Sequence, residues 1–172
     1  MKTRDIAATA VFAALICVAA PFSVPVGPIP LSLATLAVYL AGAILGTKRG
    51  TIAVAVYIAL GAFGLPVFSG FSGGLQKLLG VTGGYIAGYL PCSAAVGVTI
   101  RAARGRTIGY AAGMVIGTIL CYTLGTAWFM AQTGSKLGAA IALCVAPFLL
   151  GDAIKIAVAT AVAPIIRRRL KL

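Results

Sequence analysis

Two ionisable residues of opposite charge lie inside the last long apolar segment of the chain. Asp152 is one of only two acidic residues, and Lys155 is the only basic residue well inside an apolar segment, here about 137–166. Residues three apart on a helix share a face, so each charge can offset the other. An ion in hydrocarbon costs about 2.5–3.5 kcal/mol on insertion scales, so such residues normally face a bundle interior or a wet cavity. We interpret the pair as the floor of a ligand site; the alternative is an ion pair that only determines helix packing.

The two groups suit a ligand that carries both N–H donors and C=O acceptors, because the carboxylate accepts and the ammonium donates. Such charge-assisted hydrogen bonds contribute roughly 1.5–3 kcal/mol each. A ureido or amide group has this pattern, and so does an amino-acid zwitterion. The chain has few residues that could act in catalysis: two acidic residues and no histidine. It also lacks a phosphate-binding P-loop string, and its four cysteines do not have C-x-x-C spacing. We therefore expect no enzyme activity, no cofactor and no metal site.

The composition indicates a membrane protein. Of the 172 residues, 61% are hydrophobic and 9% charged, whereas soluble chains carry about 25% charged residues. Apolar runs of the length needed to cross a hydrocarbon core of about 30 Å recur along the chain. We predict an all-α integral membrane protein with a single domain, 1–172, made of one bundle of six transmembrane helices. The expected spans are about 6–22, 31–45, 51–65, 83–102, 107–131 and 137–166.

The basic residues are distributed asymmetrically about these spans. In the six-span arrangement one side carries Lys2, Arg4, Lys48, Arg49, Arg101, Arg104, Arg106, Arg167, Arg168, Arg169 and Lys171, and the other side carries Lys77 and Lys136. This is the positive-inside pattern and places both termini in the cytoplasm. The net charge of +12 therefore flanks apolar spans instead of forming one presented surface, so we do not expect nucleic acid as a partner.

Two irregular stretches follow on the opposite, outer side. Residues 21–30 contain four prolines and cannot continue a helix; the stretch is either a lid or wall over a cavity or a tight connector. Residues 68–85 contain six glycines, and irregular backbone at membrane depth is expected where it lines a cavity. We expect Phe71 and Tyr85 to sandwich a ring and Gln76 and Thr82 to hydrogen-bond it.

The predicted depth of the Asp152–Lys155 pair in the membrane agrees with a site on the outer side. Asp152 lies 15 residues before Arg167, about 22 Å along a helix, which places it in the outer half of the bilayer. We therefore predict that the pair and the glycine-rich stretch form one pocket that opens outward.

The first span carries small residues at helical spacing. Ala10 and Ala14 are four apart, as are Thr9 and Ala13. Such faces let helices approach closely in lipid. The partner is either another helix of this chain or a second membrane protein, and the spacing alone leaves both open.

Several strings resemble the BioY family, the biotin-binding S components of energy-coupling factor (ECF) vitamin transporters. The resemblance is carried by GLPVFSGFSGG (64–74), LLGVTGGYIAGY (78–89), the block at 24–50 and GDAIK (151–155). It implies six helices, biotin capture from outside, and a location in the lipid of the bacterial cytoplasmic membrane. It also implies an energising module of a transmembrane T protein and two ATPases. The missing P-loop agrees with this, because ATP would be hydrolysed by those partners.

The resemblance also suggests roles for individual residues. Asp152 and Lys155 match the positions expected to hold the polar bicyclic head of biotin, Tyr85 matches the family's GGY tyrosine, and Ala10 and Ala14 match the helix that meets the T protein. Phe71, Gln76 and Thr82 are further candidates for the ligand site. Many members have proline where this chain has Val81, which implies a small change in loop stiffness.

Two other function classes remain open from the residues. The chain can be a solitary proton-coupled or facilitative carrier with Asp152 as its proton site, or a membrane scaffold in which the ion pair only specifies packing.

Overall fold

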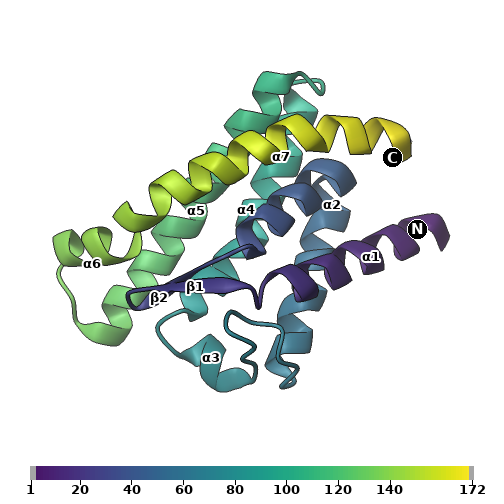
Figure 1. Ribbon diagram of the computed structural model, residues 1–172. Coiled ribbons are helices and arrows are strands. Elements are labelled where there is room, and N and C mark those ends of the chain that lie inside the picture. Colours follow the sequence, from purple (N-terminus) through teal and green to yellow (C-terminus); the bar gives the residue numbers. More distant parts are fainter. Residues whose placement is uncertain (1–2, 171–172) are drawn as a thin grey trace.

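The structure is a computed structural model that describes residues 3–170, and most of its elements are helices (Figure 1). In chain order these are α1 (Thr3–Ala19), β1 (Ser23–Val26), β2 (Ile29–Ser32), α2 (Ala34–Ala62), α3 (Leu75–Leu79), α4 (Gly83–Ala102), α5 (Thr107–Thr133), α6 (Leu137–Cys144), the 3-10 helix η1 (Ala146–Phe148) and α7 (Leu149–Leu170). Helix α4 packs between α2 and α5. Helix α1 packs on α2, and α7 packs on both α2 and α5.

Four stretches of the described residues are long and apolar enough to cross a membrane. They are Ala34–Ala62, Gly83–Ala102, Thr107–Thr133 and Leu137–Leu170, the last comprising α6, η1 and α7. Helix α1 has 17 residues, slightly shorter than the other candidates. The structure is therefore that of a mostly helical protein with several candidate membrane helices.

Helix α2 covers two of the spans predicted from the sequence. The element consists of two helices joined by a kink at the predicted turn 46–50, where Gly46 has φ 78° and ψ −179°. A positive φ favours glycine because it has no Cβ. The sequence located this change of direction correctly: the chain folds back so that Gly50 lies against Ala41 and Gly42.

The proline-rich stretch forms a β-hairpin, so the all-α prediction is wrong for this segment. Strands β1 and β2 pair antiparallel, with Val26 opposite Ile29. Gly27 has φ 73° and Pro28 a fixed negative φ, as expected of a type II′ two-residue turn. Prolines are tolerated because both strands lie at an edge of this two-stranded sheet.

The residues just before the hairpin contact the glycine-rich stretch. The Gly70 N–H donates to the Pro21 carbonyl at 3.0 Å, and the rings of Phe22 and Phe71 meet edge-on with centroids 5.8 Å apart. These contacts join the two irregular segments that the sequence predicted on the outer side.

The last apolar segment is interrupted near its middle. Helix α6 ends at Cys144, and α7 begins at Leu149 after the single turn η1, which contains Pro147. Proline lacks an N–H and disfavours helix at the preceding residue. The break places Asp152 in the first turn of α7, where the helix dipole favours a negative charge.

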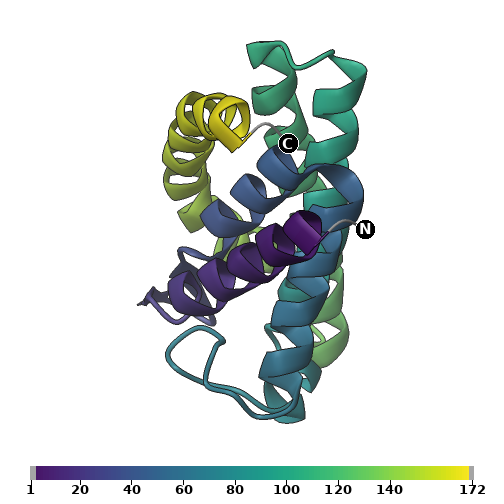
Figure 2. The ribbon, with the colours of Figure 1, turned by 90° about the vertical axis from the view of Figure 1, so that its right-hand side faces the viewer.

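The basic segments gather at one end of the molecule. Arg4 donates to the Leu170 carbonyl, which joins the two terminal helices. Arg49, next to the α2 kink, forms an ion pair with Asp5 at 2.9 Å, and Arg167 donates to the Ala43 carbonyl at 3.3 Å. Figure 2 views the molecule from this side, with α1, the first half of α2 and α7 next to one another.

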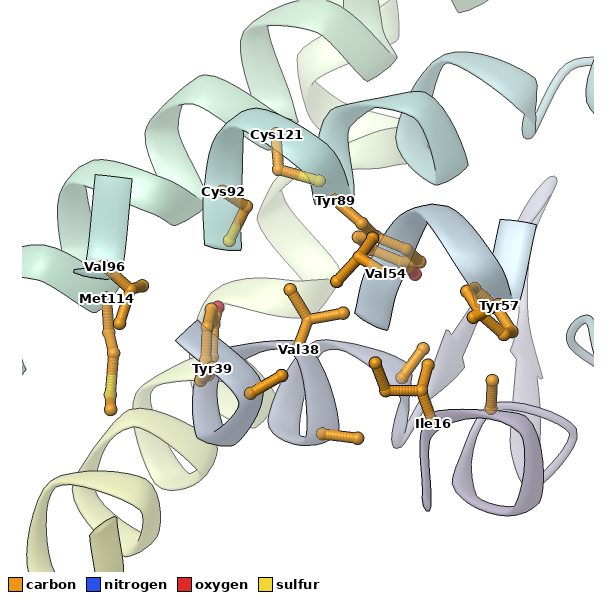
Figure 3. Packing of buried hydrophobic residues seen from close by; sticks show 14 of the residues in the cluster. Ile16, Val38, Tyr39, Val54, Tyr57, Tyr89, Cys92, Val96, Met114 and Cys121 are labelled. Carbon is orange, nitrogen blue, oxygen red and sulfur yellow. The ribbon is translucent and has the colours of Figure 1, made fainter. Parts of the chain in front are cut away.

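The buried core lies where α1, α2, α4 and α5 meet (Figure 3). The fully buried side chains include Ile16 of α1, Val38 and Tyr39 of α2, and Cys92 and Val96 of α4. The Tyr39 hydroxyl hydrogen-bonds that of Thr118 in α5 at 2.5 Å, so its polar atom is satisfied within the core.

Candidate ligand-binding site

Asp152 and Lys155 form a buried ion pair on α7. Lys155 Nζ lies 2.9 Å from Asp152 Oδ1, and only 4% of Asp152 and 8% of Lys155 are exposed. The i, i+3 spacing on one helix face therefore has the consequence predicted from the sequence. Buried charges of this kind require further hydrogen-bond partners to offset the loss of hydration.

Those partners come from the hairpin and two other helices. Lys155 Nζ also donates to the Ser32 carbonyl of β2 at 2.8 Å and to the Thr35 hydroxyl of α2 at 2.9 Å. The Tyr122 hydroxyl of α5 donates to Asp152 Oδ2 at 2.6 Å, and the Thr35 hydroxyl lies 3.3 Å from Asp152 Oδ1. Three parts of the chain that are far apart in sequence thus meet at the pair: the β2–α2 region, α5 and α7.

The pair borders a cavity of about 40 Å³. Its walls combine aromatic rings, small polar groups and the inner side of the hairpin. The lining residues are Ile29, Pro30, Leu31, Ser32, Thr35, Tyr85, Tyr89, Cys121, Tyr122, Cys144, Phe148, Asp152 and Lys155. A space of this size holds little more than water, so a larger guest requires wall residues to move apart.

Tyr85 lines the same cavity, as the sequence predicted. Its hydroxyl lies 3.0 Å from the Thr126 hydroxyl and 3.5 Å from the Cys144 carbonyl. Its ring occupies space left by Gly125 of α5, where an added Cβ would lie 2.3 Å from Tyr85 Cδ1. Because glycine has no side chain, position 125 leaves room for the Tyr85 ring and so determines where the ring lies.

The structure does not bring the other three predicted ligand residues to this cavity. Phe71 is 63% exposed and packs on Phe22, so it does not face Tyr85 across a shared space. Gln76 is exposed on α3. Thr82 is buried at the start of α4, and its hydroxyl donates to the Lys77 carbonyl at 3.4 Å.

The glycines of residues 68–84 were expected to line a ligand cavity, but the structure gives them a role in backbone packing. A Cβ at Gly83 would lie 1.7 Å from the Leu78 carbonyl oxygen, and one at Gly73 would lie 2.2 Å from that of Leu65. These glycines let the chain fold closely on itself. Within the described residues, the predicted glycine-lined pocket is instead lined by aromatic residues and the hairpin.

The hairpin fulfils one of the two roles considered for the proline-rich stretch. Residues 29–32 form part of the cavity wall, so the stretch is more than a connector. Ser32, Thr35 and Tyr122 were not predicted as site residues. Ser32 and Thr35 are polar residues near the start of an apolar run, which is a weak signal, and nothing in the sequence around Tyr122 marks it.

The two small-residue stripes of α1 face opposite directions. Thr9 and Ala13 are buried in the bundle, whereas Ala10 and Ala14 are exposed. Exposed large apolar side chains accompany the outer stripe: Ile6, Val11, Leu15 and Val18. The inner stripe makes the contact within the chain, and the outer stripe is free for another occupant in the described structure.

Comparison with known proteins places this architecture in a family. The model of the BioY family matches residues 1–172. A biotin transporter BioY of Thermotoga maritima is 38% identical over 160 residues, which cover 93% of this chain and 94% of that protein. A biotin transporter BioY of Rhodobacter capsulatus is 39% identical over 175 residues, covering 93% and 91%.

A solved structure agrees in three dimensions. The crystal structure of the S-component for biotin from an ECF-type ABC transporter matches with a TM-score of 0.88 and 28% identity, over 97% of this chain and 92% of that chain. Proteins of this kind are transporter components, not enzymes. The chain belongs to the BioY family.

Proposed function

We propose that this protein is the biotin-binding S component of an ECF transporter. The observation that carries the proposal is the buried Asp152–Lys155 pair beside a cavity that Tyr85 also lines. Membership in the BioY family and the match to a biotin S component agree with it.

The polar groups of the site suit the ureido head of biotin. Its two N–H groups would donate to Asp152, and its carbonyl would accept from Lys155. The aromatic walls formed by Tyr85, Tyr89 and Phe148 would contact the apolar part of the bicyclic ring. We propose Asp152, Lys155 and Tyr85 as the primary ligand residues, and Phe71, Gln76 and Thr82 as residues that reach the ligand only after the outer loops rearrange.

The hydrogen bonds of Lys155 suggest how binding opens the cavity. An ammonium has three donors, and here they serve Asp152 Oδ1, the Thr35 hydroxyl and the Ser32 carbonyl. A ligand carbonyl can be bound only by replacing one of these acceptors. Ser32 belongs to the hairpin, so the replacement would release the cavity wall that a guest of this size must displace.

We further propose a six-span arrangement of residues 1–172 in the bacterial cytoplasmic membrane, with both termini in the cytoplasm. In this arrangement α1 is one span, the halves of α2 before and after Gly46 are two, α4 and α5 are two, and α6, η1 and α7 form the last. The collection of basic segments at one end supports it.

The energising partners would be a transmembrane T protein and two ATPases. The exposed stripe of Ala10 and Ala14 on α1 is the proposed docking surface for the T protein, because small residues allow close helix contact in lipid. ATP hydrolysis would belong to the two ATPases.

Isothermal titration of the purified chain with biotin tests the site. The two acidic residues offer a matched pair of variants: Asp152→Asn in the cavity and Asp5→Asn at the basic end. Loss of one charge-assisted hydrogen bond predicts about 10- to 150-fold weaker binding for Asp152→Asn, with Asp5→Asn close to wild type. Equal affinity of Asp152→Asn and wild type would refute the site. A folded wild type without biotin binding would refute the function.

An uptake experiment separates this function from a solitary carrier. We expect biotin uptake only when the T protein and ATPases are co-expressed. Uptake in cells that lack them, abolished by a protonophore, would instead support a carrier in which Asp152 takes up a proton.

A further inference from the structure

A groove at the basic end of the molecule lies outside the site described above. It has a volume of about 430 Å³ and is lined by Thr107 at the start of α5 and by residues of α7: Thr160, Ala161, Pro164, Ile165, Arg168 and Arg169. Helix α7 crosses α5 at an angle, and the two separate toward the end of α7 (Figure 1). The groove is the space between them, which we call the α5–α7 groove.

In the part of the chain that the structure describes, neither arginine of the groove forms an ion pair with an acidic side chain. The chain has only two acidic residues, and both are paired elsewhere: Asp5 with Arg49 and Asp152 with Lys155. Arg167, the neighbour of the two, donates to the Ala43 carbonyl. Within residues 3–170, no carboxylate lies within ion-pair distance of Arg168 or Arg169, and both side chains are exposed, so an anionic group from outside can reach them.

The lining of the groove is charged at one end and more apolar toward the other. Arg168 and Arg169 lie at one end, and Ala161 lies seven residues earlier on the same helix, about 10 Å away. Pro164 and Ile165 supply apolar surface between these ends, and the hydroxyl groups of Thr107 and Thr160 are further polar groups of the lining. A guest that matches this gradient has an anionic head and an apolar tail.

We propose that the α5–α7 groove binds an anionic phospholipid, with the phosphate of its headgroup at Arg168 and Arg169 and the start of an acyl chain along Ala161 and Ile165. Guanidinium groups match phosphate oxygens in a bidentate geometry. Basic grooves between membrane helices on the cytoplasmic side are suited to anionic headgroups. The inference rests on the membrane arrangement proposed above and not on biotin recognition.

Native mass spectrometry of the full chain in an uncharged detergent tests the proposal. Phosphatidylglycerol and phosphatidylcholine with identical acyl chains are added in turn, without biotin. The variant Arg168→Gln/Arg169→Gln removes the charges of the groove. Arg101→Gln/Arg104→Gln removes two exposed arginines that do not line the groove, one in the last turn of α4 and one in the connection to α5. Ala161→Trp fills the apolar end without changing the charge.

We expect phosphatidylglycerol to bind the wild type and the Arg101/Arg104 variant with similar affinity, and phosphatidylcholine to bind both more weakly. Each basic residue near an anionic surface contributes about a five-fold change in binding, so the Arg168/Arg169 variant should bind phosphatidylglycerol about 25-fold more weakly. Ala161→Trp should also weaken it. Equal losses in the Arg168/Arg169 and Arg101/Arg104 variants would refute the groove.

A thermal-unfolding experiment distinguishes a lipid from a free anion. Inorganic phosphate that stabilises the wild type as strongly as phosphatidylglycerol, with no effect of Ala161→Trp on either, would refute the lipid. Biotin titration of the same variants separates the two proposals. Lost lipid binding with intact biotin binding supports the groove alone, and unchanged lipid binding refutes it whatever the result with biotin.

Discussion

The Tyr122 hydroxyl donates a hydrogen bond of 2.6 Å to Oδ2 of Asp152, on the opposite side of the carboxylate from Lys155. The two oxygens of the carboxylate are therefore held by different elements: Oδ2 by α5, and Oδ1 by Lys155 of α7 together with Thr35 of α2. This arrangement fixes the orientation of the acid that we propose as the acceptor for the ligand.

Tyr122→Phe should weaken biotin binding while leaving the fold intact. The substitution keeps the ring in the cavity wall and removes one hydrogen bond to a charged group, so we expect about a 10-fold loss or more. Calorimetry measures it, with Tyr110→Phe as the control because Tyr110 is a buried tyrosine of the same helix that does not line the cavity. Equal affinities for the two variants would contradict a role for Tyr122 in positioning Asp152.

Lys155→Met should destabilise the protein strongly, because it leaves the buried Asp152 carboxylate without its cation. Removing one partner of a buried ion pair typically costs about 3–5 kcal/mol. The double variant Asp152→Asn/Lys155→Met should recover part of this loss, since neither buried charge remains, yet it should not recover biotin binding. Thermal unfolding together with biotin titration measures both quantities.

This double variant also separates a ligand site from a purely structural ion pair. If the pair only specified packing, biotin binding would recover in parallel with stability. Asp5→Asn serves as the control at the other ion pair, where both side chains are partly exposed and the expected change is about 1 kcal/mol or less.

Gly125→Ala should reduce biotin affinity through Tyr85. The added Cβ would lie 2.3 Å from the Tyr85 ring, so the ring must shift, and the space open to it includes the cavity. Gly138→Ala in α6 is the matched control, because nothing lies within 4 Å of a Cβ there. Both changes replace a helical glycine by alanine, so a selective loss of binding in Gly125→Ala assigns the effect to the ring.

Ala10→Leu/Ala14→Leu should abolish biotin uptake without changing biotin affinity of the isolated chain. Both side chains are exposed, so the larger residues do not disturb the bundle, but they prevent close approach of a partner helix. Uptake assays and co-purification with the T protein measure the loss. Val11→Leu, an exposed position on the same helix with a bulky side chain already present, is the control; uptake retained by the Ala10/Ala14 variant would contradict the docking surface.

The features that could be predicted from the amino-acid sequence are those that depend on short-range spacing. Residues three apart place Asp152 and Lys155 on one face of whatever helix contains them, and the apolar environment requires that this face be sheltered. Proline excludes helix between residues 21 and 30, and the grouping of basic residues beside apolar runs indicates the end of the molecule at which they gather. Each of these follows from local geometry or from the cost of burying charge.

The groups from distant parts of the chain that complete the site could not be predicted, because they depend on how the helices pack. Ser32 and Thr35 lie more than 100 residues from Lys155 in the chain, and Tyr122 reaches Asp152 because α5 packs on α7. Packing likewise determined that Thr9 and Ala13 face inward while Ala10 and Ala14 face outward, and that the glycines near Gly83 accommodate their own chain instead of a ligand. The spacing of residues along a helix determines which of them share a face. Which element that face packs against depends on how the side chains of all the helices fit together.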